Sequence, residues 1–423
     1  MFFISTVSVS ASGQRSLLFM KKGSFPVCLI VLPVVLCSLT DAWADTSPPS
    51  TSLSLERIHD KEDLKEKRFE LKWLKDGDDY TFLKKAAQEK YKDSKEIWIA
   101  TATNPDDAKI IVSADALVPD GSETPLEIDG YDFSPDRSLL LLFTNSERVW
   151  RRNSRGDYWV YDRQGKTLKK LGGPKATPSS LMFAKFSPAG THVAYVREDH
   201  IHIESLTDHS IRTLTTSSNN RTFNGRFDWV YEEELGIRDG FRWSPDGKAI
   251  AYWQFDETGV RKQTLVDHTS ALYPRVLRFG YPKAGQKNAA CRIGVVEVET
   301  SETTWIQIPG DPREHYLARM DWAGPNNSDE LIIQQLNRAQ DTKVVMIANR
   351  RGGQVSPILT EKDPAWVIMH NDLHWTPDGK AFTWTSERDG WEQLYRVSRD
   401  GATTTKITTD DFDIDLLHVD HSG

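Results

Sequence analysis

The sequence predicts an all-β protein, specifically a β-propeller of four-stranded blades. Three observations support this prediction: a short turn motif recurs along the chain, an apolar run of strand length follows each copy, and the copies stand at similar intervals. A period of about fifty to sixty residues with several short strands per unit is typical of propellers. A pair of packed sheets would explain the strands but not the period.

The turn motif consists of an aromatic residue, then Ser or Thr, then Pro, then Asp or Ala. Proline presets φ for the second position of a tight turn, and Asp and Gly suit the later positions. We expect each heading aromatic side chain to pack against a neighbouring unit. Four clear copies occur at residues 133–136, 186–190, 243–247 and 375–379, and two weaker ones at 73–77 and 322–325.

The strands follow the turns. Each turn leads into an apolar run such as residues 249–253, and a further run, such as residues 158–162, precedes the next turn. Alternating runs of this kind, closed by polar turns, indicate antiparallel sheet. The heading residues stand at 73, 133, 186, 243, 322 and 375, so successive copies are 60, 53, 57, 79 and 53 residues apart. This spacing indicates about six blades. The longest interval contains an insertion, residues 257–285, which we expect to leave the propeller as an arm.

The amino terminus is organised like a signal peptide. Residues 20–22 supply basic charge, residues 25–39 are mostly apolar but short for a bilayer span, and residues 42–44 have the small-x-small form of a cleavage site. We expect a signal peptide over residues 1–44 with its start at Met20, a lead-in over residues 45–65 and the propeller over residues 66–423. An uncleaved membrane anchor is the alternative, although no stable membrane span is expected.

Cysteine content and charge narrow the compartment and the partners. Cleavage after Ala44 would remove Cys28 and Cys37 and leave Cys291, so no internal disulfide is expected. Export without disulfides points to the periplasm or the extracellular space of a bacterium. The 423 residues carry a net charge of -8, which argues against nucleic acid as a partner because no basic face balances it.

The most informative stretch for function is residues 228–235, where Glu232, Glu233 and Glu234 stand among aromatic residues. Neighbouring carboxylates repel one another and raise one another's pKa. Carboxylates that face one point can, however, satisfy the three N–H donors of a primary ammonium. The alternative is a solvated acidic turn. We expect a short helix or loop at a blade rim, with Glu233 and Glu234 turned away from bulk water.

Several motifs together resemble the amino-terminal propeller of the dipeptidyl peptidase IV group, in the prolyl oligopeptidase family of serine peptidases. The resemblance covers residues 52–420. It rests on residues 228–235, 238–247 and 281–285, and it is supported by residues 385–391 and by Trp150-Arg151. The tripled Glu after Trp-Val-Tyr is its most specific feature.

The resemblance implies that the propeller binds peptides with a free amino terminus. Glu233 and Glu234 would bind that terminus, Glu232 would support them, and Arg151 would bind the carbonyl of the substrate's second-site residue and so orient the first peptide group. Arg152 is an alternative for this last role, and a surface ion pair is the alternative for Arg151. The arm, residues 257–285, would be a site of homodimerisation. No cofactor is implied.

The chain also departs from the family's pattern. No Gly-x-Ser-x-Gly occurs in the 423 residues, so the nucleophile elbow is absent. About six repeat units are visible where the family's propeller has eight. The α/β-hydrolase domain with its Ser, Asp and His would lie beyond Gly423, so we predict no catalytic residue in this chain and expect a truncated or split product that does not hydrolyse peptides alone. Two function classes remain: the substrate-gating propeller of an exported exopeptidase, and a non-enzymatic propeller that binds peptides or proteins.

Two further clusters were considered as metal sites. His200 and His202 share one face of a predicted strand and could chelate a metal, but no third ligand is evident, and packing histidines are the alternative. A run of aspartates could bind calcium, but it lacks the glycine-centred spacing of a calcium loop, and a solvated turn is the alternative. We therefore predict no metal site. The aspartates are Asp410, Asp411, Asp413 and Asp415.

Overall fold

The computed structural model describes residues 53–59, 70–74, 77–217, 219–371, 373–416 and 418–419. The described residues from 72 onward belong to one compact unit, and those before residue 72 belong to a second. The described part of the second unit includes α1 (Leu55–His59). The predicted signal segment, its cleavage site, Cys28 and Cys37 lie outside the described residues. Within the described ranges, no helix is both long and apolar enough to cross a membrane.

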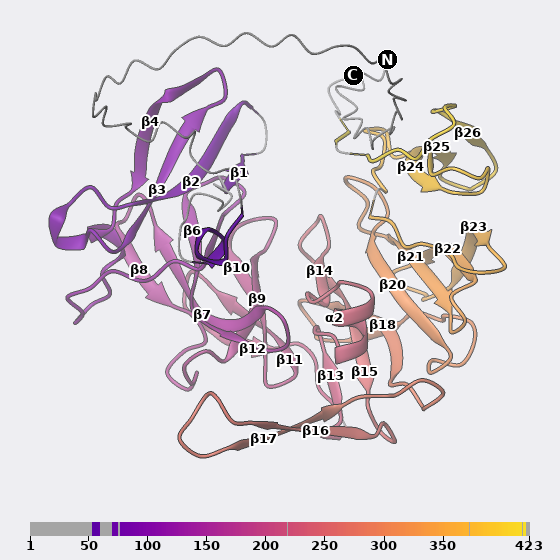
Figure 1. Ribbon diagram of the computed structural model, residues 1–423, viewed down its shortest axis with the longest axis horizontal. Helices are drawn as coiled ribbons and strands as arrows, with labels where there is room; N and C mark the ends of the chain where they lie inside the picture. Colours follow the sequence, from indigo (N-terminus) through magenta and orange to yellow (C-terminus); the bar gives the residue numbers. More distant parts are fainter. Residues whose placement is uncertain are drawn as a thin grey trace, which may run out of the picture. The chain divides into compact units, whose positions relative to one another are not determined.

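The unit that starts at residue 72 consists of antiparallel sheets that follow one another along the chain (Figure 1). The first sheet has the order β1-β2-β3-β4, and the next two repeat units are joined by pairing between β7 and β9. Their strands are β1 (Leu71–Trp73), β2 (Asp79–Lys85), β3 (Lys95–Thr101), β4 (Asn104–Val112), β5 (Gly130–Phe133), β6 (Leu139–Arg148), β7 (Asn153–Asp162), β8 (Thr167–Lys170), β9 (Leu181–Phe186), β10 (His192–Arg197), β11 (His200–Ser205) and β12 (Ile211–Thr213). Short 3-10 turns stand at η2 (Glu89–Tyr91) and η3 (Asp115–Leu117).

Three further repeat units complete the described sheets. The fourth unit contains the helix α2 (Trp229–Glu234) and the separate hairpin β16–β17. The last sheet has the order β24-β25-β26. The strands are β13 (Thr222–Asn224), β14 (Phe241–Trp243), β15 (Ala249–Asp256), β16 (Lys262–Asp267), β17 (Arg275–Gly280), β18 (Ala290–Glu297), β19 (Thr303–Trp305), β20 (His315–Trp322), β21 (Glu330–Asn337), β22 (Thr342–Asn349), β23 (Val355–Lys362), β24 (Ala381–Ser386), β25 (Gln393–Ser398) and β26 (Thr404–Lys406).

These sheets confirm the all-β prediction and the predicted units. The heading aromatic residue ends the first strand of a unit, as Trp243 ends β14, and the apolar run after the turn is the second strand. The heading residues also contact a neighbouring unit as expected. The indole of Trp243 donates to the Lys185 carbonyl at 3.4 Å, and that of Trp322 donates to the Arg242 carbonyl at 3.4 Å.

The fourth unit looks five-stranded but is a four-stranded blade with one interrupted strand. β13 and β14 both pair with β15: Asn224 lies opposite Gln254, and Phe241 lies opposite Tyr252. The two short strands are therefore successive parts of one strand position beside β15. Residues 225–240, which contain α2, form an excursion between them.

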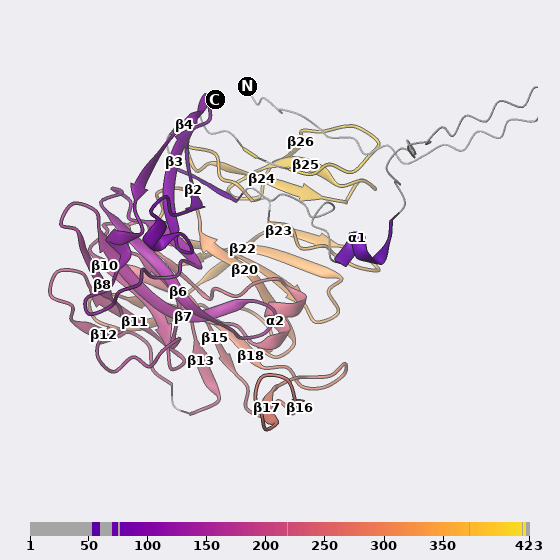
Figure 2. The same cartoon turned by 60° about the vertical axis from the view of Figure 1, so that its left-hand side comes forward.

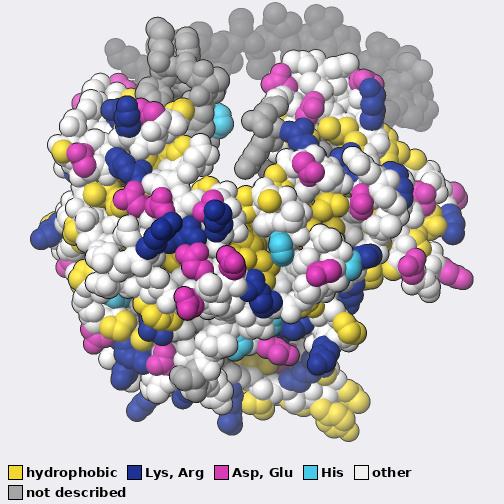
Figure 3. All heavy atoms as spheres, turned by 180° about the vertical axis from the view of Figure 1, so that it is seen from behind, with side chains coloured by type: hydrophobic (Ala, Val, Ile, Leu, Met, Phe, Trp, Pro, Cys, Tyr) yellow, Lys and Arg dark blue, Asp and Glu magenta, His cyan; other side chains and the backbone are white. Residues whose placement is uncertain are grey.

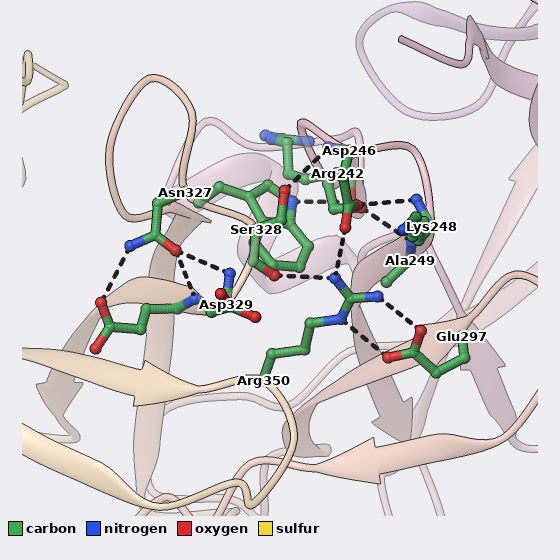
Figure 4. A network of polar contacts seen from close by, with 12 residues as sticks. Arg242, Asp246, Lys248, Ala249, Glu297, Asn327, Ser328, Asp329 and Arg350 are labelled. Atoms are coloured by element: carbon green, nitrogen blue, oxygen red, sulfur yellow. Dashed lines mark hydrogen bonds and ion pairs between the residues drawn. The ribbon is translucent and has the colours of Figure 1, made fainter. Parts of the chain in front are cut away.

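A polar network joins the fourth and fifth units (Figure 4). The Arg350 side chain is 5% exposed and donates to both carboxylate oxygens of Glu297, at the end of β18, at 2.9 and 2.6 Å. It also donates to the Ser328 carbonyl at 3.0 Å and to Asp246, in a turn motif, at 3.3 Å. Planar, two-pronged pairing of this kind fixes orientation as well as distance. The turn motif thus also serves as a contact between neighbouring units.

The predicted arm is the hairpin β16–β17, which enters after β15 and returns before β18, the strand that pairs with β15 (Figures 1 and 2). Its tip is apolar and open to solvent: Leu272 is 93% exposed, Tyr273 79% and Val276 58%. Figure 3 shows hydrophobic side chains gathered at its lower right, where the arm lies. The hairpin thus forms a two-stranded sheet separate from that of the blade.

Candidate functional site

The acidic segment is an excursion closed at a glycine neck. Gly240 donates to the Gly225 carbonyl at 3.1 Å. A Cβ at Gly240 would lie 2.5 Å from the Gly225 carbonyl carbon, and Gly225 has φ +75° with no room for a Cβ beside Ile201 and Val196. Only glycine allows this approach and this conformation. The neck therefore holds the two ends of residues 225–240 together.

Inside the excursion, Asp228 starts the helix α2. Asp228 has extended dihedral angles, and its carboxylate accepts the Tyr231 N–H at 3.0 Å, as an N-cap does. The side chain is buried, and this burial raises the pKa of Asp228 to about 7 against the opposing effect of the Tyr231 N–H. The carboxyl group thus caps the helix at the cost of an unfavourable charge above neutral pH.

Tyr231 fixes the helix to the core and to the fifth unit. Its ring stands edge-on to Phe255, with centroids 4.8 Å apart. Its hydroxyl accepts the Leu317 N–H at 2.9 Å, at the point where the register between β20 and β21 shifts. The N–H that the irregular strand frees is therefore satisfied by the helix. Buried Asp228 and Tyr231 thus fix the backbone of the helix that carries the acidic residues.

The three glutamates of α2 have different surroundings. The Glu233 side chain is 9% exposed, whereas Glu234 at the helix end is exposed. Successive helical residues are rotated by about 100° from one another, so three adjacent side chains cannot face one point. The expectation that both Glu233 and Glu234 are turned from bulk water is therefore right for Glu233 and wrong for Glu234.

Glu232 is the member of the acidic cluster whose charged form the folded protein disfavours. Its Oε1 atom is buried and has no hydrogen-bond partner among the described residues. Burial is the main cause that raises the pKa of Glu232; Glu233 adds to the effect, while Arg238 and Arg152 oppose it. The pKa of Glu232 is thus raised by burial more than by its neighbouring carboxylate.

Arg151 reaches the helix from a distant hairpin. The β6–β7 hairpin pairs Arg148 with Asn153, and the Val149 N–H donates to the Arg152 carbonyl at 3.1 Å, so residues 149–152 form its tip. The Arg151 Nε–H donates to the Glu233 carboxylate. The Arg151 side chain is 81% exposed. The structure therefore brings Arg151 and Glu233 together from opposite ends of the predicted site.

A cavity of about 300 Å³ is bordered by residues that closely follow Arg151 and Glu233 in the sequence. It is lined by Asn153 and Ser154, just after the hairpin tip, and by residues 236–238, just after α2. The Ser154 Oγ is buried and unpaired within the described part of the chain. The residues that follow each of the two predicted segments therefore border one cavity, and a buried hydroxyl group that is unpaired among the described residues lies in its wall.

The comparisons with known proteins agree with this geometry. Residues 134–423 match the family model of the dipeptidyl peptidase IV (DPP IV) N-terminal region. The chain belongs to this family. It is 28% identical over 335 residues to dipeptidyl peptidase 4 of Arthroderma otae, covering 76% of this chain and 41% of that protein. It is 29% identical over 306 residues to the Felis catus enzyme of the same name, covering 66% of this chain and 39% of that protein.

A solved structure supports the same assignment. The crystal structure of Porphyromonas gingivalis dipeptidyl peptidase 4 superimposes with a TM-score of 0.72 at 26% identity, covering 82% of this chain and 47% of that one. The predicted β-propeller of the DPP IV type is confirmed. The chain spans less than half the length of each of these relatives.

The site of this DPP IV-type propeller includes residues that the sequence did not single out. Arg238 acts on Glu232 through its charge, and Tyr281 and Phe279 stack on Trp229 and Trp150. Arg238 lies in a different matching motif from Glu232, six positions later in the sequence. This spacing alone does not indicate that the two side chains are neighbours. The two rings lie at the root of the arm: Tyr281 belongs to one of the matching motifs and Phe279 does not, and the sequence assigned no role to either.

The histidine pair serves packing. His202 is buried, stacks on Tyr195 with centroids 5.8 Å apart, and contacts Arg197 O and Thr213 Oγ1 through its two ring nitrogens. Burial lowers the pKa of His202 to about 4. Of the acidic run near the carboxyl terminus, Asp413 accepts the Glu392 N–H at 2.8 Å, which ties that turn to β25.

Proposed function

We propose that this chain is the substrate-gating propeller of an exported dipeptidyl-peptidase-IV-like serine exopeptidase, and that it binds the free amino terminus of peptides. Glu233 and Glu234 are the primary acceptors of the ammonium group, Glu232 supports them, and Arg151 binds the first peptide carbonyl groups. The observation that carries this proposal is the contact between Arg151 and the nearly buried Glu233, on a helix fixed by Asp228 and Tyr231.

The arrangement suits an incoming amine. Arg151 uses its Nε–H for Glu233, and its exposed guanidinium leaves the remaining N–H groups for a peptide carbonyl. The Glu234 carboxylate has no partner among the described residues and is open to solvent. An ammonium group placed between Glu233 and Glu234 would donate charge-assisted hydrogen bonds to oxygens on a fixed helix. The distance between the bound ammonium group and Arg151 then determines which peptide carbonyl group Arg151 can bind.

The test of amine binding uses a fluorinated peptide, Gly-Pro-(4-fluoro)Phe amide, titrated with the full chain and followed by 19F NMR. The wild-type chain is expected to bind the free peptide and to bind its acetylated form at least about tenfold more weakly. Each of the variants Glu233→Gln and Glu234→Gln should weaken binding of the free peptide by about tenfold to a hundredfold, because each removes one charge-assisted contact.

The matched control is Glu299→Gln, which neutralises an exposed glutamate on another strand connection and should leave the affinity unchanged. Acetylated peptide is expected to respond to none of the three substitutions. Equal affinity for free and acetylated peptide would refute the amine site.

We further propose that the arm, residues 257–285, is the contact of a homodimer. The exposed apolar tip supports this, because Leu272, Tyr273 and Val276 offer a surface that a second copy would cover. Replacing Leu272 by Asp and Tyr273 by Ser should convert a dimer to a monomer in sedimentation velocity at micromolar concentration. A wild-type chain that sediments as a monomer throughout that range would contradict the proposal.

A further inference from the structure

The two halves of the proposed amine site are joined by a row of aromatic rings at the root of the arm. The row runs from Trp150 through Phe279 and Tyr281 to Trp229. Its ring centroids are separated by 4.6 Å between Trp150 and Phe279, 6.0 Å between Phe279 and Tyr281, and 4.2 Å between Tyr281 and Trp229. Figure 2 shows the arm beside α2, as these contacts require.

Each end of the row is attached to one half of the site. Trp150 immediately precedes Arg151 at the tip of the β6–β7 hairpin. Trp229 is the first residue of α2, three and four positions before Glu232 and Glu233, so it shares their side of the helix. The position of either tryptophan therefore sets the position of a polar side chain next to it.

The hairpin tip is held at Val149, which packs against a core cluster, and at Arg151 through Glu233, while most of the Arg151 side chain stays exposed. Arg151 is 81% exposed, and its backbone carbonyl accepts from Arg148 within the same turn. A long side chain on an exposed turn loses considerable rotamer freedom when it is held in one place. The stacking of Trp150 on Phe279 ties this turn to another part of the fold and so reduces that loss.

The middle of the row is itself fixed. Gly280 stands between Phe279 and Tyr281 and is buried, and a Cβ there would lie 2.5 Å from a Glu257 carboxylate oxygen. The Tyr281 N–H donates to the Arg261 carbonyl at 2.9 Å, and Phe279 pairs with Gln263 across the hairpin. The two rings therefore project from a backbone that the arm's own pairing holds in place.

We infer that Phe279 and Tyr281 are positioning residues of the amine site, which set the separation of Arg151 from Glu233 through Trp150 and Trp229. This inference rests on the proposed function. The arm root is thus part of peptide recognition, in addition to any role of the arm tip.

The test measures binding of the same fluorinated peptide to the full chain. Phe279→Ala and Tyr281→Ala should each weaken binding of the free peptide by about threefold to tenfold, because the polar groups lose their fixed placement. Tyr281→Phe keeps the ring and should restore wild-type affinity. Leu277→Ala, two residues before Phe279 on the same strand and 50% exposed, is the matched control and should have no effect.

A double-mutant cycle separates positioning from general damage. If Phe279 acts through Arg151, Phe279→Ala should have no further effect on affinity in an Arg151→Ala background. Two outcomes would overturn the inference but not the amine site. One is that the losses of affinity from Phe279→Ala and Arg151→Ala are additive. The other is that Phe279→Ala and Tyr281→Ala both leave the affinity unchanged while the wild type still prefers the free peptide. A wild type that binds free and acetylated peptide equally would instead remove the amine site itself.

Discussion

Replacing Asp228 by Asn is expected to stabilise the protein at pH 8 by about 2–4 kcal/mol. Burial raises the pKa of Asp228 to about 7, above the value of about 4 for an unfolded aspartate. The folded state therefore favours the protonated carboxyl group. The contribution of this group to the free energy of unfolding is fully present below about pH 4 and is lost as the pH rises through 7. Asparagine keeps an oxygen that accepts the Tyr231 N–H and carries no charge.

Urea unfolding at pH 5 and pH 8 would measure this effect. The difference between Asp228→Asn and wild type should be small at pH 5 and large at pH 8. The matched control is Asp363→Asn: Asp363 is exposed and accepts the N–H groups of Ala365 and Trp366, which lower its pKa. That substitution should not stabilise at pH 8. If Asp228→Asn is no more stable than wild type at pH 8, then the ionised carboxyl group of Asp228 does not destabilise the folded protein.

The variant Glu361→Gln is expected to destabilise the protein at neutral pH by about 3–5 kcal/mol. Glu361 on β23 lies 3.1 Å from the ammonium group of Lys343, which is fully buried, and it accepts from Trp384 at 3.0 Å and Arg388 at 2.8 Å on the next unit. Glutamine keeps one acceptor oxygen but no negative charge, so the buried ammonium retains neutral acceptors such as the Ile368 carbonyl and loses the opposite charge of Glu361. An uncompensated buried charge accounts for the large expected loss.

The acid dependence of stability gives this prediction a second measurement. Burial alone would raise the pKa of Glu361, but the charge of Lys343 and the hydrogen bonds from Ser386, Trp384 and Arg388 lower it to about 2. The stabilisation of the folded protein by ionised Glu361 is present above about pH 4.5 and is lost as the pH falls towards 2.

Urea midpoints of wild type should therefore fall between those pH values more steeply than those of Glu361→Gln. The matched control is Glu302→Gln, at an exposed position, which should follow the wild type. Parallel curves for wild type and Glu361→Gln would contradict this account.

Much of the fold was accessible from the sequence because its repeat has strong local causes. Pro, Asp and Gly specify the turns by their own backbone preferences, so the amino-acid order alone places Trp243 and its counterparts beside strands. The interruption of one strand by residues 225–240 was not accessible. It depends on Gly225 and Gly240 meeting across 15 positions in sequence, and a glycine's close contact leaves no local pattern.

The contact between Arg151 and Glu233 joins two residues that the sequence singled out, but the orientation of the side chains was not predictable. A short helix or loop was expected around Glu232, and Arg151 was named through the resemblance. Which carboxylate is buried depends on helical rotation and on where α2 ends. A run of three glutamates therefore does not predict that Glu233 is nearly buried and Glu234 exposed. Phe279 and Tyr281 were missed because their role arises from packing between distant segments.

The glycine neck has a consequence for how this protein family can evolve. Because Gly225 and Gly240 are held together by a backbone hydrogen bond, the excursion leaves and rejoins the blade at one point, and buried side chains such as Phe227 and Tyr231 anchor it to the core. Substitutions or small insertions elsewhere between the two glycines leave the pairing of β13 and β14 with β15 untouched. Recognition can therefore drift under selection while the scaffold stays constant, in the way that surface loops diversify on a conserved framework.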